Sequence, residues 1–329
     1  MCFEVRSSPV TPKRSPQIGQ AAGELVLTEL QIEQMELQFS HAERAAAQRL
    51  IELALAEDLG DTGDVTSLAL IGSEEQAETI VVSREAGRLA GVPIAEMIFG
   101  ALDSSVRWST KRGDGSRLQP GTVVATLAGP LRAILCGERT ALNFLAHLSG
   151  IATLTARYAE AVAGTNATIF DTRKTLPGYR LLEKYAVRAG GGANHRVGLY
   201  DGCLIKDNHL AARSHSRDAA DVAEAVRQAK QAVGPNLTVE VEVDTLEQLS
   251  AALGASADIV LLDNMEPATL RKAVELRDSI APTVLLEASG GVSLETVAEI
   301  ARTGVERISV GALTHSADAL DLALDWKTP

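Results

Sequence analysis

The sequence has few cysteines and no long apolar run. Its three cysteines, Cys2, Cys136 and Cys203, lie far apart and form no CxxC pair, so they indicate no disulfide framework and favour a reducing compartment. No stretch approaches the roughly 20 apolar residues that cross a membrane, and the opening residues lack the apolar run of a secretory signal. We therefore expect a cytoplasmic protein with no membrane partner.

Positive charge is also scarce in the chain as a whole. The sequence has 31 lysine and arginine residues against 43 aspartate and glutamate residues, a formal net charge of −12, which argues against a nucleic-acid partner. The segment 171–209 is the exception, because its lysines and arginines outnumber its acidic residues seven to four. A local cationic cluster in an acidic chain indicates a small, highly anionic ligand.

The 329 residues can bury one large core or two moderate ones. A helical pattern over 28–58 precedes short β-like runs, among them Thr79–Ser83 and Thr122–Leu127, separated by turns and helical segments. We expect four parts in chain order: a mobile tail over 1–27, a sandwich-like α+β domain over 28–150, an α/β barrel over 151–312, and over 313–329 a helix that packs back on the N-terminal domain.

Beyond residue 166 apolar strand-like segments alternate with helical ones. Strands are expected at about 167–171, 203–207, 238–243, 259–263, 283–288 and 307–311, and helices at about 179–189, 216–233, 245–254, 267–279 and 294–303. Such alternation predicts an α/β protein with parallel strands joined by crossovers, and the last four strand ends are 21, 26 and 22 residues apart, one βα unit each. Since no GxGxxG follows the first strand, we favour a barrel of about six units, closed or partly open, over a doubly wound sheet.

In a parallel barrel the active site lies at the C-terminal strand ends, and here each strand end carries polar residues or glycine. The first two strands contribute cations, the next two carboxylates and the last two glycine turns, in the order Arg173 and Lys174, Lys206, Glu242, Asp263, Ser289-Gly290-Gly291, and Gly311 with Ala312. His195 and Arg196 add positive charge nearby. This order predicts a phosphorylated sugar on one side of the barrel and a compact polyanion on the other.

The glycine turns favour phosphate binding, because a phosphate can approach backbone N–H groups there, and a helix expected to begin near 294 adds its dipole. Glu242 and Asp263 can bind Mg²⁺ or accept hydrogen bonds from sugar hydroxyls. Structural roles stay open for several of these residues. The two carboxylates can pair with Lys174 and Lys206, the Arg173 loop can be solvated, and His195-Arg196 can be a cap or a surface pair.

Other charged residues are given no ligand role. No comparable context surrounds His41, His147, His215 and His315. We expect solvated or interface charges at three positions of the helix over 179–189, namely Arg180, Lys184 and Arg188.

A series of motifs resembles the quinolinate phosphoribosyltransferase family over about residues 45–325. In chain order the motifs are Glu57-Asp-Leu-Gly60, Gly63-Asp-Val-Thr66, Glu138-Arg-Thr-Ala-Leu-Asn143, Asp171-Thr-Arg-Lys-Thr175, Glu183-Lys-Tyr-Ala-Val187, Gly190 to Arg196, Leu204-Ile-Lys-Asp-Asn-His209, Val239-Glu-Val-Glu-Val243, Ile259-Val-Leu-Leu-Asp-Asn264, Leu286-Glu-Ala-Ser-Gly-Gly291 and Ile308-Ser-Val-Gly-Ala-Leu-Thr-His315. The resemblance implies that quinolinate reacts with phosphoribosyl pyrophosphate in the presence of Mg²⁺. The implied products are nicotinate mononucleotide, pyrophosphate and CO₂, in NAD biosynthesis.

The resemblance also implies roles for individual residues. The carboxylates of quinolinate would be held by Arg173, His195, Arg196 and Lys206, with Arg139 contributed by a neighbouring subunit of a homodimer or larger homo-oligomer. The phosphoribosyl donor would lie near Thr172 and Lys174, with its phosphate on Ser289, Gly290, Gly291, Gly311 and Ala312. Glu242 and Asp263 would hold the ribose and Mg²⁺, and with Lys174 they would act in catalysis.

Three other functions stay open. A paralogue from a metal-cofactor operon would lack the Asn194-His-Arg and Ile205-Lys-Asp-Asn-His patterns, both of which are present. A Schiff-base lyase would use Lys206 as its nucleophile. A non-catalytic phosphosugar-binding protein leaves His195 and Arg196 unexplained. Leu176 and Tyr179 depart from the residues usual in the family, which places substrate affinity, not reaction type, in question.

Overall fold

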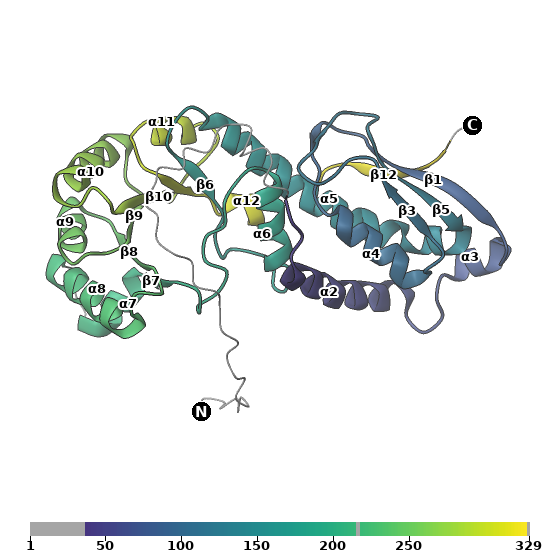
Figure 1. Cartoon of the computed structure of the whole chain (residues 1–329), viewed down its shortest axis with the longest axis horizontal. Helices are drawn as coiled ribbons and strands as arrows, with labels where there is room; N and C mark the ends of the chain where they lie inside the picture. Colours follow the sequence, from purple (N-terminus) through teal and green to yellow (C-terminus); the bar gives the residue numbers. More distant parts are fainter. Residues whose placement is uncertain (1–36, 215–217, 328–329) are drawn as a thin grey trace, which may run out of the picture. The chain divides into compact units, whose positions relative to one another are not determined.

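The computed structural model of the protein describes residues 37–214 and 218–327. The tail expected over 1–27, the start of the helical pattern at 28 and His215 lie outside the described residues. The described chain forms an N-terminal domain on an antiparallel sheet and a C-terminal domain on a parallel sheet, with the elements labelled in Figure 1. The predicted α/β class with an N-terminal α+β domain is confirmed.

The N-terminal domain has a four-stranded antiparallel sheet in the order β12-β1-β5-β3. Its strands are β1 (Gln76–Ser83), β3 (Arg107–Thr110), β5 (Val123–Pro130) and β12 (Leu322–Trp326), with a separate pair formed by β2 (Gly87–Arg88) and β4 (Arg117–Leu118). Its helices are α2 (His41–Leu59), α3 (Val65–Leu70), α4 (Val92–Leu102) and α5 (Leu131–Ala161). A capping box begins α2, since Ser40 and Glu43 each accept a hydrogen bond from the other's backbone N–H.

The C-terminal domain has a six-stranded parallel sheet in the order β6-β11-β10-β9-β8-β7. Its strands are β6 (Thr168–Phe170), β7 (Cys203–Ile205), β8 (Val239–Val243), β9 (Ile259–Asp263), β10 (Leu285–Ser289) and β11 (Arg307–Ser309). Its helices are α6 (Arg180–Ala189), α7 (Asp207–Ser214), α8 (Ala219–Val233), α9 (Leu246–Gly254), α10 (Pro267–Ile280), α11 (Val297–Ala301) and α12 (Ala312–His315). Among the described residues no ladder joins β6 to β7, so the barrel takes the partly open form.

The two faces of the parallel sheet differ in polarity. On β8, Val239, Val241 and Val243 are at most 1% exposed and point toward the helices, while Glu240 and Glu242 alternate with them and point inward. The register continues this pattern, because Glu242 and Glu287 both pair with Leu261 of the strand between them. Period-two alternation therefore supplies an apolar outer layer and a polar interior from the same strands.

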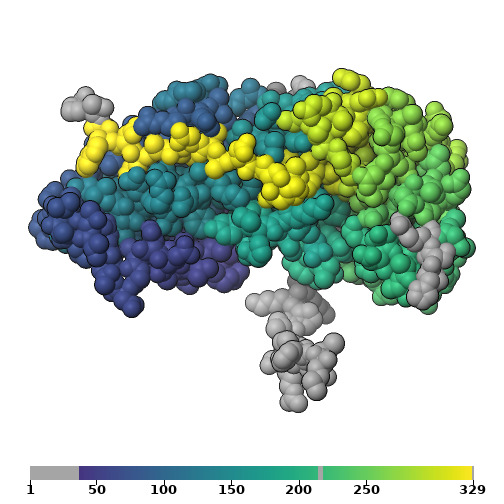
Figure 2. Space-filling model, turned by 180° about the vertical axis from the view of Figure 1, so that it is seen from behind, coloured from purple at the N-terminus to yellow at the C-terminus, as the bar shows by residue number. Residues whose placement is uncertain are grey.

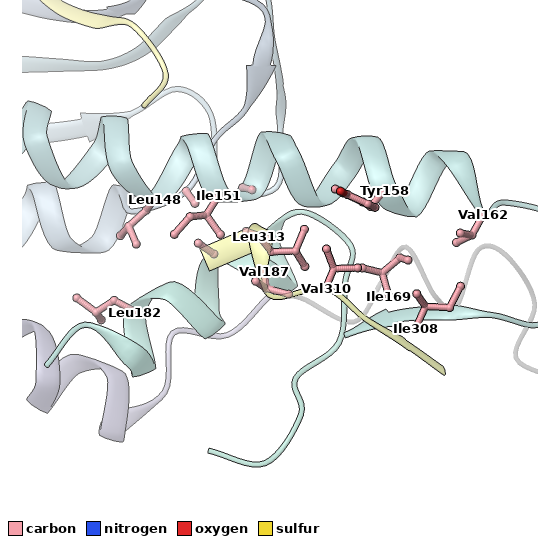
Figure 3. Packing of buried hydrophobic residues seen from close by; sticks show 14 of the residues in the cluster. Leu148, Ile151, Tyr158, Val162, Ile169, Leu182, Val187, Ile308, Val310 and Leu313 are labelled. Carbon is pink, nitrogen blue, oxygen red and sulfur yellow. The ribbon is translucent and has the colours of Figure 1, made fainter. Parts of the chain in front are cut away.

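Helix α5 connects the two domains through a continuous apolar core. Its residues Leu148, Ile151 and Tyr158 are buried in one cluster with Val187 of α6 and Ile169 of β6, and Figure 3 shows these side chains between the helix and the barrel elements. Helix α5 begins directly after β5 of the N-terminal sheet and ends at Ala161, shortly before the first barrel strand begins at Thr168. In the part of the chain that the structure describes, no helix has both the length and the apolar character to cross a membrane.

The prediction of a helix over 313–329 is wrong. In the described part of this segment, up to Lys327, the one helix is the short α12 (Ala312–His315). Leu322–Trp326 instead forms strand β12, which pairs antiparallel with β1 from Thr79 to Ser83. Leu320, Leu322 and Leu324 alternate with less apolar residues, which is the period of a strand. The expected return to the N-terminal domain does occur, and Figure 2 shows the C-terminal residues (yellow) lying along that domain.

Candidate active site

A pocket of about 810 Å³ opens at the C-terminal ends of the barrel strands. It is lined by all but one of the residues proposed from the sequence, namely Thr172, Arg173, Lys174, His195, Arg196, Lys206, Glu242, Asp263, Ser289, Gly290, Gly291, Gly311 and Ala312. The exception is Arg139, which lies exposed on α5 and does not line this pocket. A single chain therefore assembles the whole proposed site apart from the residue assigned to a neighbouring subunit.

Two arginines on the first side of the pocket have donor groups that an anion could occupy. The Nε atoms of Arg173 and Arg196 are buried and have no hydrogen-bond partner among the described residues. Burial, and then the nearby charge of Arg173, lower the pKa of Arg196. Because a buried N–H without a partner is costly, this arrangement indicates that a ligand with acceptor oxygens completes it.

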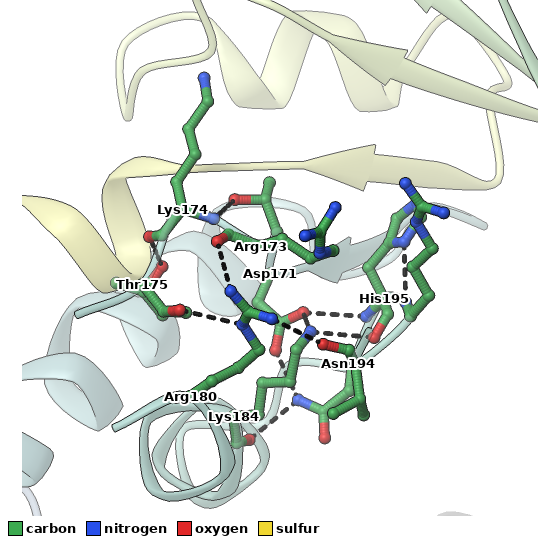
Figure 4. A network of polar contacts seen from close by, with 12 residues as sticks. Asp171, Arg173, Lys174, Thr175, Arg180, Lys184, Asn194 and His195 are labelled. Carbon is green, nitrogen blue, oxygen red and sulfur yellow. Dashed lines mark hydrogen bonds and ion pairs between the residues drawn. The ribbon is translucent and has the colours of Figure 1, made fainter. Parts of the chain in front are cut away.

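A buried ionic network holds the backbone that carries these residues (Figure 4). Lys184 of α6 is 2% exposed and pairs with Asp171, which is fully buried. Lys184 also donates to the His195 carbonyl at 2.9 Å, and Asp171 accepts from the His195 N–H at 2.9 Å. The Asn194 amide donates to the second Asp171 oxygen at 2.6 Å. Both backbone polar groups of His195 are thus fixed by one ion pair.

The expectation that the helix charges are solvated is therefore wrong for Lys184. Arg180 also turns back toward the site, donating to Thr175 Oγ1 at 3.0 Å and to the Val197 carbonyl at 3.1 Å. The α6 face that carries them packs against the strand-end loops, so their charges are used to shape those loops. Arg188 pairs with Glu43 of α2 at 2.7 Å and is an interface charge, as expected.

On the second side of the pocket the two carboxylates have different partners. The Lys206 ammonium forms an ion pair with Glu242. Asp263 accepts a hydrogen bond from the neighbouring Asn264 amide at 2.8 Å. The structural alternative for Glu242, a partner for lysine, is therefore realised. Asp263 lines the pocket and, among the described residues, pairs with no lysine or arginine.

His195 lies at the floor of the pocket, between the arginines and two buried glutamates. Its Nε2 is 3.0 Å from Glu240 Oε2 and 3.4 Å from Glu287 Oε1, while Nδ1 accepts the Arg196 backbone N–H at 2.8 Å. Burial disfavours the charged ring, but the two glutamates outweigh burial and raise the pKa of His195 to about 9. Protonation turns Nδ1 into a donor, so a charged ring has to rotate away from the Arg196 N–H and gives up this hydrogen bond, which is worth about 1 kcal/mol.

The backbone conformation of the turn after β10 requires glycine at position 290. Gly290 has φ +90°, and a Cβ atom there would lie 2.2 Å from Asn264 Oδ1. Helix α11 begins at Val297, not near 294, and has five residues. A helix dipole thus contributes little here, and any phosphate contact depends on the N–H groups of the open loop.

The sequence did not assign five residues that matter to the site: Asp171, Glu240, Asn264, Glu287 and His315. His315 and Asn264 line the pocket, and a Cβ atom at Gly311 would come within 3.2 Å of His315 Nε2. Glu240 could have been found, because Val239-Glu-Val-Glu-Val243 places it on the same face as Glu242. Nothing local in the sequence signals His315 or the buried pair of Asp171.

The fold and the pocket define an α/β-barrel enzyme that binds anionic ligands. Comparison with known proteins places the chain more narrowly. Residues 64–149 match the N-terminal domain of quinolinate phosphoribosyl transferase, and residues 151–325 match its C-terminal domain. The chain belongs to the quinolinate phosphoribosyltransferase family.

Relatives and solved structures agree with this placement. The chain is 48% identical over 290 residues to the carboxylating nicotinate-nucleotide pyrophosphorylase of Mycobacterium leprae, covering 87% of this chain and 99% of that protein. It is 44% identical to the probable enzyme of the same name from Bacillus subtilis, covering 84% and 92%. The structure of the nicotinate-nucleotide pyrophosphorylase from Francisella tularensis superposes with a TM-score of 0.79 at 38% identity, covering 86% of this chain and 96% of that chain.

Proposed function

We propose that the protein transfers the phosphoribosyl group of phosphoribosyl pyrophosphate to quinolinate and releases CO₂. The products are nicotinate mononucleotide and pyrophosphate, so the reaction supplies NAD biosynthesis. The observation that carries this proposal is the pocket itself, in which two arginines with unpartnered buried Nε atoms face a rim of carboxylates and glycine turns. A reducing cytoplasm suits the two described cysteines, Cys136 and Cys203, which are both free.

The first side of the pocket suits a dicarboxylate. Arg173 and Arg196 offer planar guanidinium groups that can bind a carboxylate through two N–H donors. His195 lies beneath them, and Lys206 adds a point charge at the edge of the pocket. When a carboxylate binds, Lys206 can leave Glu242 for the ligand, because the pair lies at the pocket wall, where the lysine side chain is 46% exposed.

The second side of the pocket suits the phosphoribosyl donor. Lys174 is exposed at the pocket, and its backbone carbonyl accepts a hydrogen bond from Thr314 at 2.8 Å, which ties its loop to α12. Thr172 Oγ1 accepts the Lys174 N–H at 3.1 Å and braces the same loop. The open backbone of Gly290 and Gly291 supports a phosphate contact. These features leave the Lys174 ammonium free to meet an anionic leaving group.

The residues present fit Mg²⁺. Glu242 and Asp263 end neighbouring strands and lie on the same face, since Glu242 pairs with Leu261 and Asp263 follows two residues later. Both line the pocket, and carboxylate oxygens are ligands that Mg²⁺ prefers, together with water and substrate phosphates. We assign them to the ion and to the ribose hydroxyls. When bound, Mg²⁺ supplies positive charge that neutralises the departing pyrophosphate.

The chemistry then requires positioning and electrostatics, with no covalent nucleophile. The arginines hold quinolinate so that its ring nitrogen meets the anomeric carbon, which forms a C–N bond as the C–O bond to pyrophosphate breaks. Lys174 lies where negative charge develops on the leaving group, and Glu242 with Asp263 lies where positive charge develops on the sugar. The C–CO₂ bond next to the quaternary ring nitrogen then breaks and CO₂ leaves. The bonding electron pair stays on the ring carbon, where the positive nitrogen stabilises it, and it then takes up a proton.

The site is complete only with a second chain. Arg139 is exposed on α5 and does not line the pocket of its own chain. We infer that it enters the dicarboxylate side of the neighbouring subunit's pocket in a homodimer or a larger homo-oligomer. The exposed side chains of Leu199 and Tyr200, 73% and 77% accessible on the loop after Arg196, support a subunit contact close to that side.

One experiment decides between this function and its rivals. Purified protein with quinolinate, phosphoribosyl pyrophosphate and Mg²⁺ should release CO₂ and form nicotinate mononucleotide, and nicotinate should not replace quinolinate. Folded protein without product above background would refute the proposal. A Schiff-base lyase is disfavoured because Lys206 forms an ion pair with Glu242, whereas such a lyase needs a free lysine amine as its nucleophile. Borohydride trapping with a carbonyl substrate would reveal one.

A further inference from the structure

Four charged side chains meet in the interior of the barrel beneath the pocket. His195 and Glu240 are 8% and 5% exposed, and Glu287 is fully buried. Glu287 also accepts a hydrogen bond from Arg307 Nε at 2.7 Å, and the Arg307 guanidinium stacks 3.7 Å from the Phe170 ring centroid. Strands β8, β10 and β11 and the loop between α6 and β7 each supply one member, so the cluster forms only when the barrel does.

The two glutamates are incompletely neutralised. Arg307 donates to Oε2 of Glu287, whereas Oε1 of Glu287 and Oε1 of Glu240 are buried and have no hydrogen-bond partner within residues 37–214 and 218–327. Burying such acceptors costs free energy unless a charge nearby compensates. The nearest group able to supply that charge is the His195 ring, whose Nε2 faces both carboxylates.

A divalent cation is the competing occupant. One donor atom each from His195, Glu240 and Glu287 lie within 4.8 Å of one another, a spacing that an ion could bridge. Such an ion would have to displace any proton from Nε2, and it would lie close to the guanidinium groups of Arg307 and Arg196. With one glutamate already paired to Arg307, a singly charged ring balances the cluster and a doubly charged ion does not.

We propose that Glu240 and Glu287 are positioning residues that hold His195 as an imidazolium beneath the substrate's carboxylates, with the ring turned so that its Nδ1–H no longer faces the Arg196 N–H. The dicarboxylate side of the pocket then contains a third buried cation besides Arg173 and Arg196. The inference rests on the proposed function, because it assigns a cause to the affinity of that site for quinolinate. Neither glutamate needs to touch the substrate, since each acts through the ring.

If the glutamates act through the charge of the His195 ring, their replacement changes the pH dependence of binding, which a merely structural role would not do. The groups that surround His195 are Glu240 on β8, Glu287 on β10, Arg307 on β11, Arg173 and Asp171 after β6, its neighbour Arg196 and Lys184 on α6. Replacing a glutamate by glutamine keeps its shape and removes one negative charge, so the ring loses its proton at a lower pH. The effect of the substitution should therefore be seen at alkaline pH and not at acid pH.

The test uses Glu240→Gln and Glu287→Gln in the full-length protein, with Glu306→Gln as the matched control. Glu306 also pairs with an arginine of this domain, Arg277 at 2.8 Å, but does not line the pocket. We expect the KM for quinolinate in either variant to rise about threefold at pH 8.5 and to stay unchanged at pH 6, because lowering a pKa of about 9 by one unit reduces the protonated fraction at pH 8.5 about threefold. The KM for phosphoribosyl pyrophosphate and the control variant should stay within twofold of wild type.

Several outcomes would overturn the inference. One is a defect of equal size at both pH values, and another is an equal rise in both KM values. A third is a tightly held metal ion, measured in wild-type protein as purified and lost in the glutamine variants. If neither variant folds, NMR titration of His195 in wild-type protein decides, because a ring that titrates at or below pH 6.5 refutes the proposal. Wild-type turnover itself tests the proposed function separately.

Discussion

Lys184 and Asp171 form an ion pair in the interior of the protein, with side chains 2% and 0% exposed. The pair joins α6 to the end of β6 and fixes both backbone polar groups of His195. Charges are rarely buried unless they are paired, and here the pair holds the backbone next to Arg196, one of the two arginines that we propose bind an anion. The position of the site therefore depends on a contact that never meets the substrate.

Replacing Lys184 by methionine should destabilise the protein strongly. The substitution keeps the length of the side chain but leaves the Asp171 carboxylate buried without its cation, a change that costs about 3–5 kcal/mol. Lys327→Met is the control, since Lys327 pairs with Glu78 on the surface at 47% exposure, where such a pair is worth about 0–1 kcal/mol. Urea unfolding monitored by circular dichroism measures both, and equal losses would contradict the structural role given to Lys184.

The turn after β10 should not accept a side chain. Gly290→Ala should lower the free energy of unfolding by about 1–3 kcal/mol and raise the KM for phosphoribosyl pyrophosphate, because the new Cβ atom displaces Asn264. Gly121→Ala is the matched control, with φ +84° and open space around the added atom. It should show the backbone strain alone, with the KM unchanged. If both variants raise the KM alike, the contact with Asn264 is irrelevant.

The charge of His195 should appear in the pH dependence of stability. Its pKa is raised from 6.5 to about 9 in the folded protein, so its contribution is fully present below about pH 6.5 and disappears as the pH rises through 9. We expect wild type to exceed His195→Gln in unfolding free energy by a margin that shrinks by about 1–3 kcal/mol over this range. Denaturant titrations at several pH values measure the margin, and a constant margin would contradict the raised pKa.

Two inactive variants should complement each other if Arg139 acts across subunits. Mixing Arg139→Ala with Lys206→Ala and allowing subunits to exchange should restore about a quarter of wild-type activity in a dimer, since half of the dimers regain one of two sites. The control mixture is Arg173→Ala with Lys206→Ala, whose defects belong to the same side of one pocket. It should stay inactive. Equal behaviour of the two mixtures, with subunit exchange demonstrated, would exclude a shared site.

Much of the barrel was predictable because strand and helix signals there are local. The expected strands at 238–243 and 259–263 agree closely with Val239–Val243 and Ile259–Asp263. The C-terminal segment was predicted less well, since its alternation of leucines becomes a strand only when β1 offers an edge to pair with. An isolated strand has no partner for its backbone N–H groups, so its short-range signal is weak.

The same division applies to the site. Residues that follow directly on barrel strands, such as Lys206, Glu242 and Asp263, could be proposed from the sequence, because parallel strands present their C-terminal ends at one edge. Lys184 could not, because its burial depends on α6 lying against Asp171. His315 and Asn264 could not be assigned for a similar reason, since neither is marked by a local pattern.

The sequence by itself determined the class of the fold, the order of its strands and the chemical character of each strand end, because these depend on periodicity and residue type along a short stretch of chain. Only the tertiary structure decided which charges are buried and which face a ligand. Burial of Lys184, the contact of Glu240 and Glu287 with His195, and the return of β12 to the first domain all join residues far apart in the chain. Such contacts depend on the packing of complete elements, which no local pattern encodes.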